Sequence, residues 1–159
     1  MDLTRAYRAL EKGDPEPLFR SASARFADGS DVMTAVHLSE SDFQTLIAAT
    51  LYFDSDVEVV REAQALGAKG GRIDLLILPT AGSPVKHTFL VELKYLSKAE
   101  GKTESAVKEA KEKALSQLRR YARCSNIRGI SNLKYVAAVF VGTQLAEFVT
   151  EDGGGEAQS

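Results

Sequence analysis

Asp74, Glu92 and Lys94 are charged residues inside two strongly apolar segments of the chain. Asp74 belongs to the segment G-R-I-D-L-L-I-L-P, and Glu92 and Lys94 belong to F-L-V-E-L-K-Y-L. Charged side chains are seldom buried without partners. If the three meet, Lys94 neutralises one carboxylate and leaves a second negative charge, which Mg²⁺ can balance through hard oxygen ligands. A divalent ion held in this way keeps several water molecules, which are available for chemistry.

The spacing of these residues indicates that they do meet. The run from Gly71 to Leu96 consists of two apolar β-type segments joined by a loop rich in Gly and Pro, which predicts a hairpin. The numbers of facing residues then sum to about 165 to 166. Asp74 faces Val91 or Glu92, and the interval of 18 residues favours Glu92, with Lys94 on the same strand face. Carboxylates facing each other about 5 Å apart repel unless a cation lies beside them.

A helix ahead of the hairpin carries a third carboxylate. Ser39 and Asp42 form a start similar to a capping box, and helical spacing places Glu40 and Gln44 on the apolar face, toward the sheet. The alternative role of Glu40 is purely local, because a carboxylate in the first turn complements the positive end of the helix dipole.

A long helix is predicted from Lys98 to Ala122, with an apolar stripe on one side. Gln117 and Tyr121 are four residues apart and project together beside that stripe. Gln117 is either an amide on the helix surface or part of a site.

Arginines gather near both ends of the candidate site. Arg119 and Arg120 directly precede Tyr121 at the end of the long helix, and Arg72 lies at the start of the hairpin. This composition favours contact with nucleic acid. Cations at a helix C-terminus also complement its dipole without any ligand, and a solvated charge is the default interpretation for Arg72.

The order of the predicted elements gives an α/β fold with one mixed sheet. Helices are expected within residues 1–35, where they form an N-terminal helical arm. A single α/β domain is expected over residues 36–150, and residues 151–159 form a disordered tail. The strands of the domain are expected at Asp56–Glu62, in the hairpin, and at Leu133–Val141, with a short edge strand at Gln144–Thr150.

Composition narrows the classes of function. A net charge of −2 argues against non-specific coating of DNA, although a local basic patch can still bind phosphates. The single cysteine, Cys124, excludes an internal disulfide and a cysteine metal cage, which suits a reducing, cytoplasmic location. No signal peptide and no membrane span are expected, and a homodimer is compatible with the sequence.

The pattern of Asp74 followed by Glu92-x-Lys94 resembles the PD-(D/E)xK nuclease superfamily. G-G-R-I-D-L-L-I-L-P, F-L-V-E-L-K-Y-L and A-L-S-Q-L-R-R-Y-A are most similar to the nuclease-type domain found at the C-terminal end of bacterial AAA-ATPase-like proteins, over roughly Glu40 to Gly142. The resemblance implies a restriction-endonuclease-like core (α-β-β-β-α-β), with a central mixed sheet flanked by helices. An ATPase or another protein that contacts the N-terminal arm is an implied partner.

This resemblance implies a Mg²⁺-dependent nuclease that acts on nucleic acid, with DNA favoured and Mn²⁺ as a substitute ion. Asp74, Glu92 and the carbonyl of Leu93 would hold the metal, and Lys94 would position water or stabilise developing charge. Glu40 would assist through water or a second metal, and Gln117 would orient water or phosphate. The alternative is a catalytically silent module of the same fold that binds a protein or nucleic-acid partner, with the three charges forming a buried ion-pair network.

Overall fold

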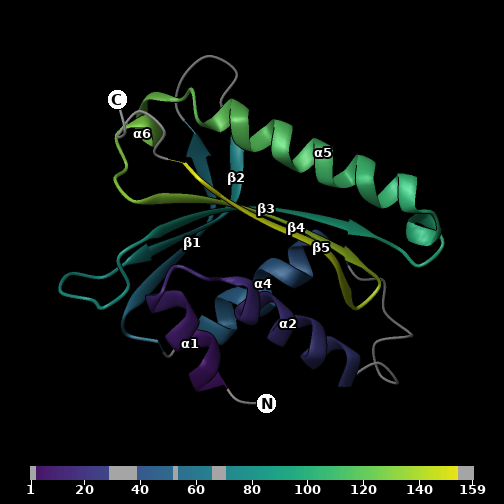
Figure 1. Cartoon of the computed structure of the whole chain (residues 1–159), viewed down its shortest axis with the longest axis horizontal. Coiled ribbons are helices and arrows are strands. Elements are labelled where there is room, and N and C mark those ends of the chain that lie inside the picture. The colour runs from purple at the N-terminus through teal and green to yellow at the C-terminus, as the bar shows by residue number, and fades with distance from the viewer. Residues whose placement is uncertain (1–2, 29–38, 52–53, 66–70, 154–159) are drawn as a thin grey trace.

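A single mixed sheet with helices on both faces organises the chain (Figure 1). The computed structural model describes residues 3–28, 39–51, 54–65 and 71–153. Within these ranges the strand order is β1-β2-β3-β4-β5. The strands are β1 (Val57–Ala65), β2 (Gly71–Pro79), β3 (Thr88–Leu96), β4 (Leu133–Val141) and β5 (Gln144–Asp152). The expected α/β class with a mixed central sheet is confirmed.

Helices surround this sheet in two groups. They are α1 (Leu3–Glu11), α2 (Glu16–Asp28), α4 (Glu40–Leu51), α5 (Glu104–Tyr121), α6 (Ser125–Arg128) and a 3-10 turn, η1 (Glu100–Lys102). The prediction that the long helix begins at Lys98 was wrong. Thr103 is its N-cap, because its hydroxyl accepts a hydrogen bond from the Ala106 N–H at 3.2 Å, and the preceding residues form η1.

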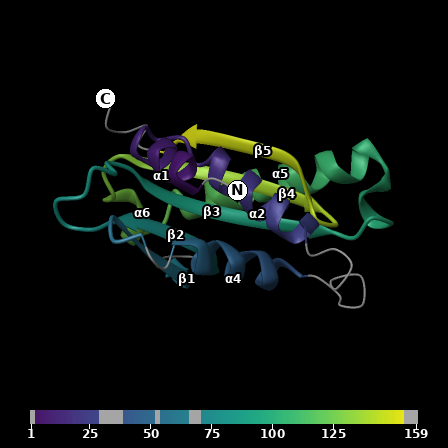
Figure 2. The same ribbon diagram turned by 90° about the horizontal axis from the view of Figure 1, so that it is seen from below.

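The strand directions explain why the long helix lies where it does. β3 and β4 pair in parallel, whereas the other neighbouring strands pair antiparallel. A parallel pair needs a crossover connection, and α5 supplies it across one face of the sheet. Figure 2 shows β3, β4 and β5 running side by side, and Figure 1 shows α5 above these strands.

Each face of the sheet has its own hydrophobic core. On one face α1, α2 and α4 pack against the sheet around Phe19, Phe43 and Phe140, with the rings of Phe43 and Phe140 stacked 4.0 Å apart. On the other face α5 packs through Ala114, Leu118 and its neighbours. The apolar stripe predicted for the long helix is therefore the face that it buries.

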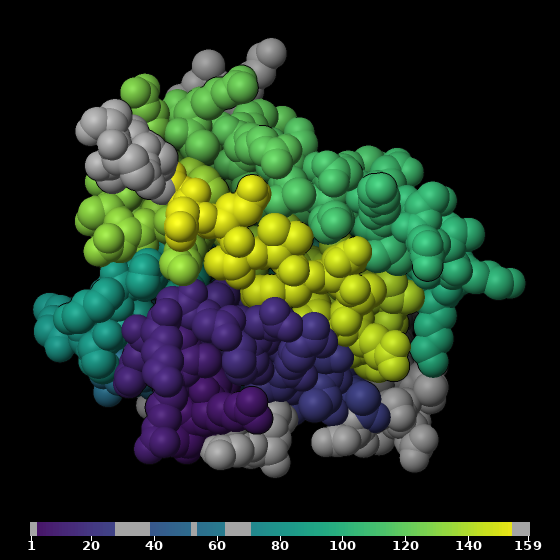
Figure 3. Space-filling model, in the orientation of Figure 1, coloured from purple at the N-terminus to yellow at the C-terminus, as the bar shows by residue number. Residues whose placement is uncertain are grey.

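The N-terminal helices belong to the first of these cores. Leu10 and Leu18 are fully buried in the same cluster as residues of β2 and β3. Two hydrogen bonds add to this packing, from the Tyr7 hydroxyl to the Thr50 carbonyl at 2.8 Å and from the Ser23 hydroxyl to the Thr143 carbonyl at 2.7 Å. Figure 3 shows these helices against β5 on the molecular surface.

The predicted segment boundaries can be compared with the structure in part. The boundary between residues 35 and 36 lies outside the described residues. β5 continues to Asp152, so the first two residues assigned to the tail belong to a strand, and residues 154–159 also lie outside the description. Among the described helices, none is both long and apolar enough to span a bilayer.

Candidate active site

The register of the β2–β3 hairpin agrees with the spacing argument. Leu75 pairs with Val91, Leu76 with Leu90 and Ile77 with Phe89, so each pair sums to the predicted 166. The same sum places Asp74 opposite Glu92, but the main-chain ladder ends before it reaches them. The two strands therefore separate where the charged residues begin.

The ladder between β1 and β2 is interrupted at the same place. Arg61 pairs with Leu75 and Ala63 pairs with Ile73, yet Glu62 and Asp74 between them do not pair. Glu62 has a φ of 53°, a left-handed backbone conformation that is uncommon for glutamate and rarer inside a strand. Asp74 thus lies at a break in the sheet on both sides, and no feature of the sequence predicted the role of Glu62 in this break.

Asp74 replaces the missing ladder bond with its side chain. The Leu93 N–H donates to Asp74 Oδ2 at 2.8 Å, across the gap between β2 and β3. A hydrogen bond to a carboxylate is stronger than one between neutral groups. This bond fixes the Asp74 carboxylate beside Glu92 and Lys94.

Glu92 is a buried carboxylate, and only one of its two oxygens lies near a partner. It is 5% exposed, and its Oε2 atom lies 3.7 Å from Lys94 Nζ. Its other oxygen, Oε1, is buried and has no hydrogen-bond partner within the described part of the chain. Buried polar atoms normally have partners, so this oxygen marks a place where another group is needed.

The pKa values of the two carboxylates are raised by burial and by neighbouring negative charges. The pKa of Glu92 is raised to about 8, mainly by burial and then by the charge of Asp74, with a smaller rise from Glu40, while Lys94 opposes the rise. The pKa of Asp74 is also raised, mainly by burial, while the hydrogen bond from Leu93 opposes the rise. Carboxylates with raised pKa values in one place are typical of functional sites.

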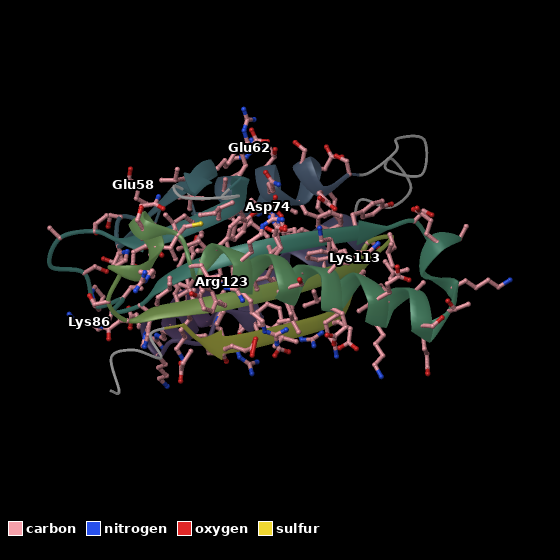
Figure 4. The ribbon with its side chains drawn as sticks, turned by 90° about the horizontal axis from the view of Figure 1, so that it is seen from above. Glu58, Glu62, Asp74, Lys86, Lys113 and Arg123 are labelled. Atoms are coloured by element: carbon pink, nitrogen blue, oxygen red, sulfur yellow. The ribbon has the colours of Figure 1, made fainter. Side chains whose placement is uncertain are left out.

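Glu40 belongs to this group of charges, as the helical pattern predicted. Its charge raises the pKa of both Asp74 and Glu92, although it lies on α4 and they lie on β2 and β3. The reciprocal bonds of Ser39 and Asp42 hold the start of the helix, including the Ser39 N–H donating to Asp42 Oδ2 at 2.7 Å. In Figure 4 Asp74 lies between the ribbons of α4 and α5.

Gln117 and Tyr121 approach the site from α5. Gln117 Nε2 donates to the Tyr121 hydroxyl at 2.9 Å, and this hydroxyl donates to the main-chain carbonyl of Arg72. The pKa of Tyr121 is raised to about 12, mainly by burial and also by the charges of Glu92 and Asp74, while the hydrogen bond from Gln117 opposes the rise. The amide of Gln117 is therefore engaged with Tyr121, and the pair ties α5 to the strand that carries Asp74.

The predicted nucleic-acid contacts differ in exposure. Arg72, Arg119 and Arg120 are exposed, and the Arg72 guanidinium lies 3.6 Å from Glu62. Arg120 lies near the site, because its charge lowers the pKa of Tyr121. Tyr121 itself is 1% exposed, which leaves no ring surface for stacking on a base, so the prediction that it contacts nucleic acid is not retained.

The donor set suits a hard cation. Two carboxylates, Asp74 and Glu92, meet here, and the unpartnered Glu92 Oε1 is an oxygen acceptor of the kind that Mg²⁺ and Mn²⁺ prefer. In the described ranges no group of three or more His, Cys, Asp or Glu side chains is arranged to hold a metal. The two carboxylates fit a site at which water supplies the remaining ligands, as is common for Mg²⁺.

A comparison with models of protein families shows to which family the chain belongs. Residues 38–148 match the model described as the PD-(D/E)XK nuclease superfamily, which is more than half of the chain. The chain belongs to the PD-(D/E)XK nuclease superfamily. Searches of curated proteins and of solved structures returned no match.

Membership in the PD-(D/E)XK superfamily agrees with the geometry of the hairpin. Asp74, Glu92 and Lys94 stand in the order that the superfamily name describes, with Ile73 where that name has Pro. The mixed sheet with flanking helices is consistent with the restriction-endonuclease-like fold of the superfamily.

Proposed function

We propose that the protein is a Mg²⁺-dependent nuclease that hydrolyses phosphodiester bonds, with DNA as the favoured substrate. One observation carries the proposal. Glu92 is buried beside Asp74, within reach of the charge of Glu40, and the ammonium of Lys94 is the cation paired with it. The surplus negative charge supports a divalent cation at this place, because a protein seldom buries uncompensated charge.

Each group has a role that follows from its position. Asp74, Glu92 and the Leu93 carbonyl would hold the ion. When bound, the ion would polarise the scissile phosphate and lower the pKa of a water molecule. Lys94 lies 3.7 Å from Glu92 and would stabilise negative charge that develops on the phosphate.

The remaining site residues support this group. Glu40 would act on water through its carboxylate, at the edge of the site that α4 provides. Gln117 would act mainly through Tyr121, since its amide donates to that hydroxyl, and its other polar atoms would be left for water or phosphate. The Gln117–Tyr121 pair would also hold the strand that carries Asp74, through the bond to the Arg72 carbonyl.

The exposed arginines support a polyanionic substrate. Arg119 and Arg120 lie in the last turn of α5 and Arg72 lies at the start of β2, with Arg120 near Gly71. Guanidinium groups bind phosphates in a bidentate manner. The overall charge of −2 would not draw DNA to the rest of the surface. Affinity would therefore depend on this local patch and decrease with salt.

Partners and location belong to the same proposal. An ATPase or another protein that contacts the N-terminal helices would have to use their outer surface, because their apolar residues are buried against the sheet. A cytoplasmic location suits the single cysteine, Cys124, which is buried and free. A homodimer is compatible with these features.

A second candidate is a catalytically silent module that binds a protein or nucleic acid. It is favoured by the lack, in the described ranges, of a three-residue cluster of metal-binding side chains. In this case Asp74, Glu92 and Lys94 would form a buried ionic network with a structural role.

Titration with metal ions separates the two candidates. For a nuclease, Mg²⁺ or Mn²⁺ raises the melting temperature of the wild-type protein, and Asp74→Ala abolishes this rise. Plasmid and single-stranded substrates are then cleaved by the wild type, and a chelator stops cleavage. Absence of both the thermal shift and cleavage would favour the silent module.

A further inference from the structure

Gln44 is a buried amide on α4 to which the proposed reaction gives no role. The residue is 5% exposed, and its Oε1 atom has no hydrogen-bond partner among the residues that the structure describes. An amide oxygen in such a place has lost its hydrogen bonds to water and gained none in return. Atoms of this kind are rare in folded proteins, so a bound group at Gln44 is the simplest explanation.

Helix geometry directs this amide toward the carboxylates. Glu40 and Gln44 are four residues apart and therefore share one face of α4. Side chains in a helix lean toward its N-terminus, so Gln44 extends toward the turn that carries Glu40. The charge of Glu40 affects both Asp74 and Glu92, which places that turn within electrostatic reach of the site.

The neighbouring groups restrict what can satisfy the amide oxygen. Ionised carboxylates accept hydrogen bonds and cannot donate them. Gln44 Oε1 accepts no hydrogen bond from any group that the structure describes, so even a protonated Glu92 does not serve it. A water molecule has two hydrogens and can donate one to Gln44 Oε1 and the other to the Glu40 carboxylate. Its lone pairs then point away from both residues, which is the orientation that a nucleophilic water needs.

An amide suits this position better than another acid would. Glu40, Asp74 and Glu92 already bring three carboxylates close enough to affect one another electrostatically. Gln44 contributes an oxygen acceptor without adding negative charge. Position 44 can therefore orient water while the net charge of the group stays unchanged.

We propose that Gln44 is a positioning residue of the nuclease site, whose amide oxygen acts with the Glu40 carboxylate to orient a water molecule for attack on the phosphodiester. The inference rests on the proposed function and extends it. It assigns the orientation of water to α4, whereas the amide of Gln117 on α5 is engaged with Tyr121.

The test compares Gln44→Met with Thr45→Ala and Gln44→His. Methionine keeps the length of the side chain and removes the oxygen acceptor, and histidine restores a polar ring nitrogen. Thr45 is the next residue of α4 and is exposed, so Thr45→Ala controls for changes in the helix. The measurements are kcat and KM for cleavage with Mn²⁺, and the melting temperature with and without Mn²⁺.

If Gln44 orients water, Gln44→Met lowers kcat by about 10²-fold, the size of effect that misplacing a reacting group has. KM and the Mn²⁺-dependent rise in melting temperature stay close to those of the wild type, and Gln44→His recovers part of kcat. Without Mn²⁺, Gln44→Met is no more stable than the wild type, since the oxygen that it removes was already satisfied by water.

Two other results would overturn the inference, and they are distinguishable. A Gln44→Met protein that is more stable than the wild type and equally active would show that the Gln44 amide binds no water and has no role in cleavage. A Gln44→Met protein that loses the Mn²⁺-dependent rise would show direct binding of the ion instead of water. If the wild-type protein itself shows neither a rise nor cleavage, the proposed function fails, and this inference fails with it.

Discussion

Leu93 donates its backbone N–H to Asp74 Oδ2 at 2.8 Å, so a side chain closes the sheet at the point where its main-chain ladder stops. Asp74 therefore has two roles, because the same carboxylate that holds the strands together faces Glu92 in the candidate site. Removing the charge of Asp74 and removing its acceptor oxygen should therefore have different consequences.

Asp74→Asn and Asp74→Ala separate these two effects. Asparagine keeps an oxygen that can accept from Leu93, whereas alanine leaves that N–H without its acceptor. We expect Asp74→Ala to be less stable than Asp74→Asn by about 1–3 kcal/mol in urea unfolding without metal. Both variants should lose cleavage by at least about 10²-fold. Equal stability of the two would contradict a structural role for the Leu93 bond.

The metal-free protein should lose stability as the pH rises. The pKa of Glu92 is raised from 4.5 to about 8, so the native state keeps a proton that the unfolded chain releases. Stability from this proton is complete below about pH 4.5 and declines until about pH 8, by an amount on the order of a few kcal/mol. Urea unfolding at several pH values measures the decline.

Glu92→Gln should reduce this pH dependence, because glutamine does not titrate, and leave only the smaller part that comes from the raised pKa of Asp74. Glu58→Gln, at an exposed position of β1, is the matched control and should leave the decline in place. Saturating Mg²⁺ should restore stability above pH 8 in the wild type and not in Glu92→Gln. A wild-type profile that is flat from pH 5 to 8 would rule out a protonated Glu92.

Lys94→Met should separate binding of the metal from chemistry. The ammonium lies 3.7 Å from Glu92 and lowers its pKa, so its loss makes Glu92 harder to ionise in the absence of metal. We expect the Mn²⁺-dependent rise in melting temperature to persist at pH 8, and cleavage to fall by about 10²-fold or more.

Lys113→Met is the control for that variant, since Lys113 is exposed on α5 and pairs with Glu109 at 3.3 Å. It should cleave as the wild type does. If Lys94→Met loses metal binding and cleavage to the same extent, Lys94 serves to hold the ion or the fold, and the role in developing charge is wrong.

Tyr121→Phe should weaken the connection between α5 and β2. It removes the hydroxyl that accepts from Gln117 and donates to the Arg72 carbonyl, while the buried ring remains. The expected loss is about 1–2 kcal/mol of unfolding free energy. Because this hydroxyl lies beside Glu92, the pH dependence of Mn²⁺ binding should also change.

Tyr7→Phe provides the comparison, because it removes a bond of the same kind, from the Tyr7 hydroxyl to the Thr50 carbonyl, in the core on the other face of the sheet. A similar loss of stability with unchanged Mn²⁺ binding is expected there. The interpretation of Tyr121 would be wrong if both variants bound Mn²⁺ as the wild type does at every pH.

Much of the site could be predicted because its residues are local in sequence. The turn between the two apolar segments sets the hairpin register, and the register places Asp74 beside Glu92 and Lys94. The reciprocal hydrogen bonds between Ser39 and Asp42 could also be predicted, since a capping box depends on a fixed spacing along the chain.

The rest depends on contacts that spacing does not encode. The break in the sheet at Asp74 requires a left-handed Glu62 on a neighbouring strand, a conformation for which glutamate has no propensity. The burial of Tyr121 depends on how α5 lies against β2, which the sequence does not show. The arginines next to Tyr121 in the sequence therefore predicted contact with nucleic acid instead. Packing decided both outcomes.

The parallel pairing of β3 with β4 also has a kinetic consequence. It joins Thr88 to Leu133, 45 positions apart (133 − 88), whereas Asp74 and Leu93 are 19 apart. The longer loop costs more entropy to close, so we expect the hairpin to form early in folding and the crossover to dock later. Substitutions that shorten buried side chains of β2 should then slow refolding, whereas those in α5 should mainly speed unfolding. Equal φ-values in the two elements, measured by stopped-flow kinetics, would argue against this order.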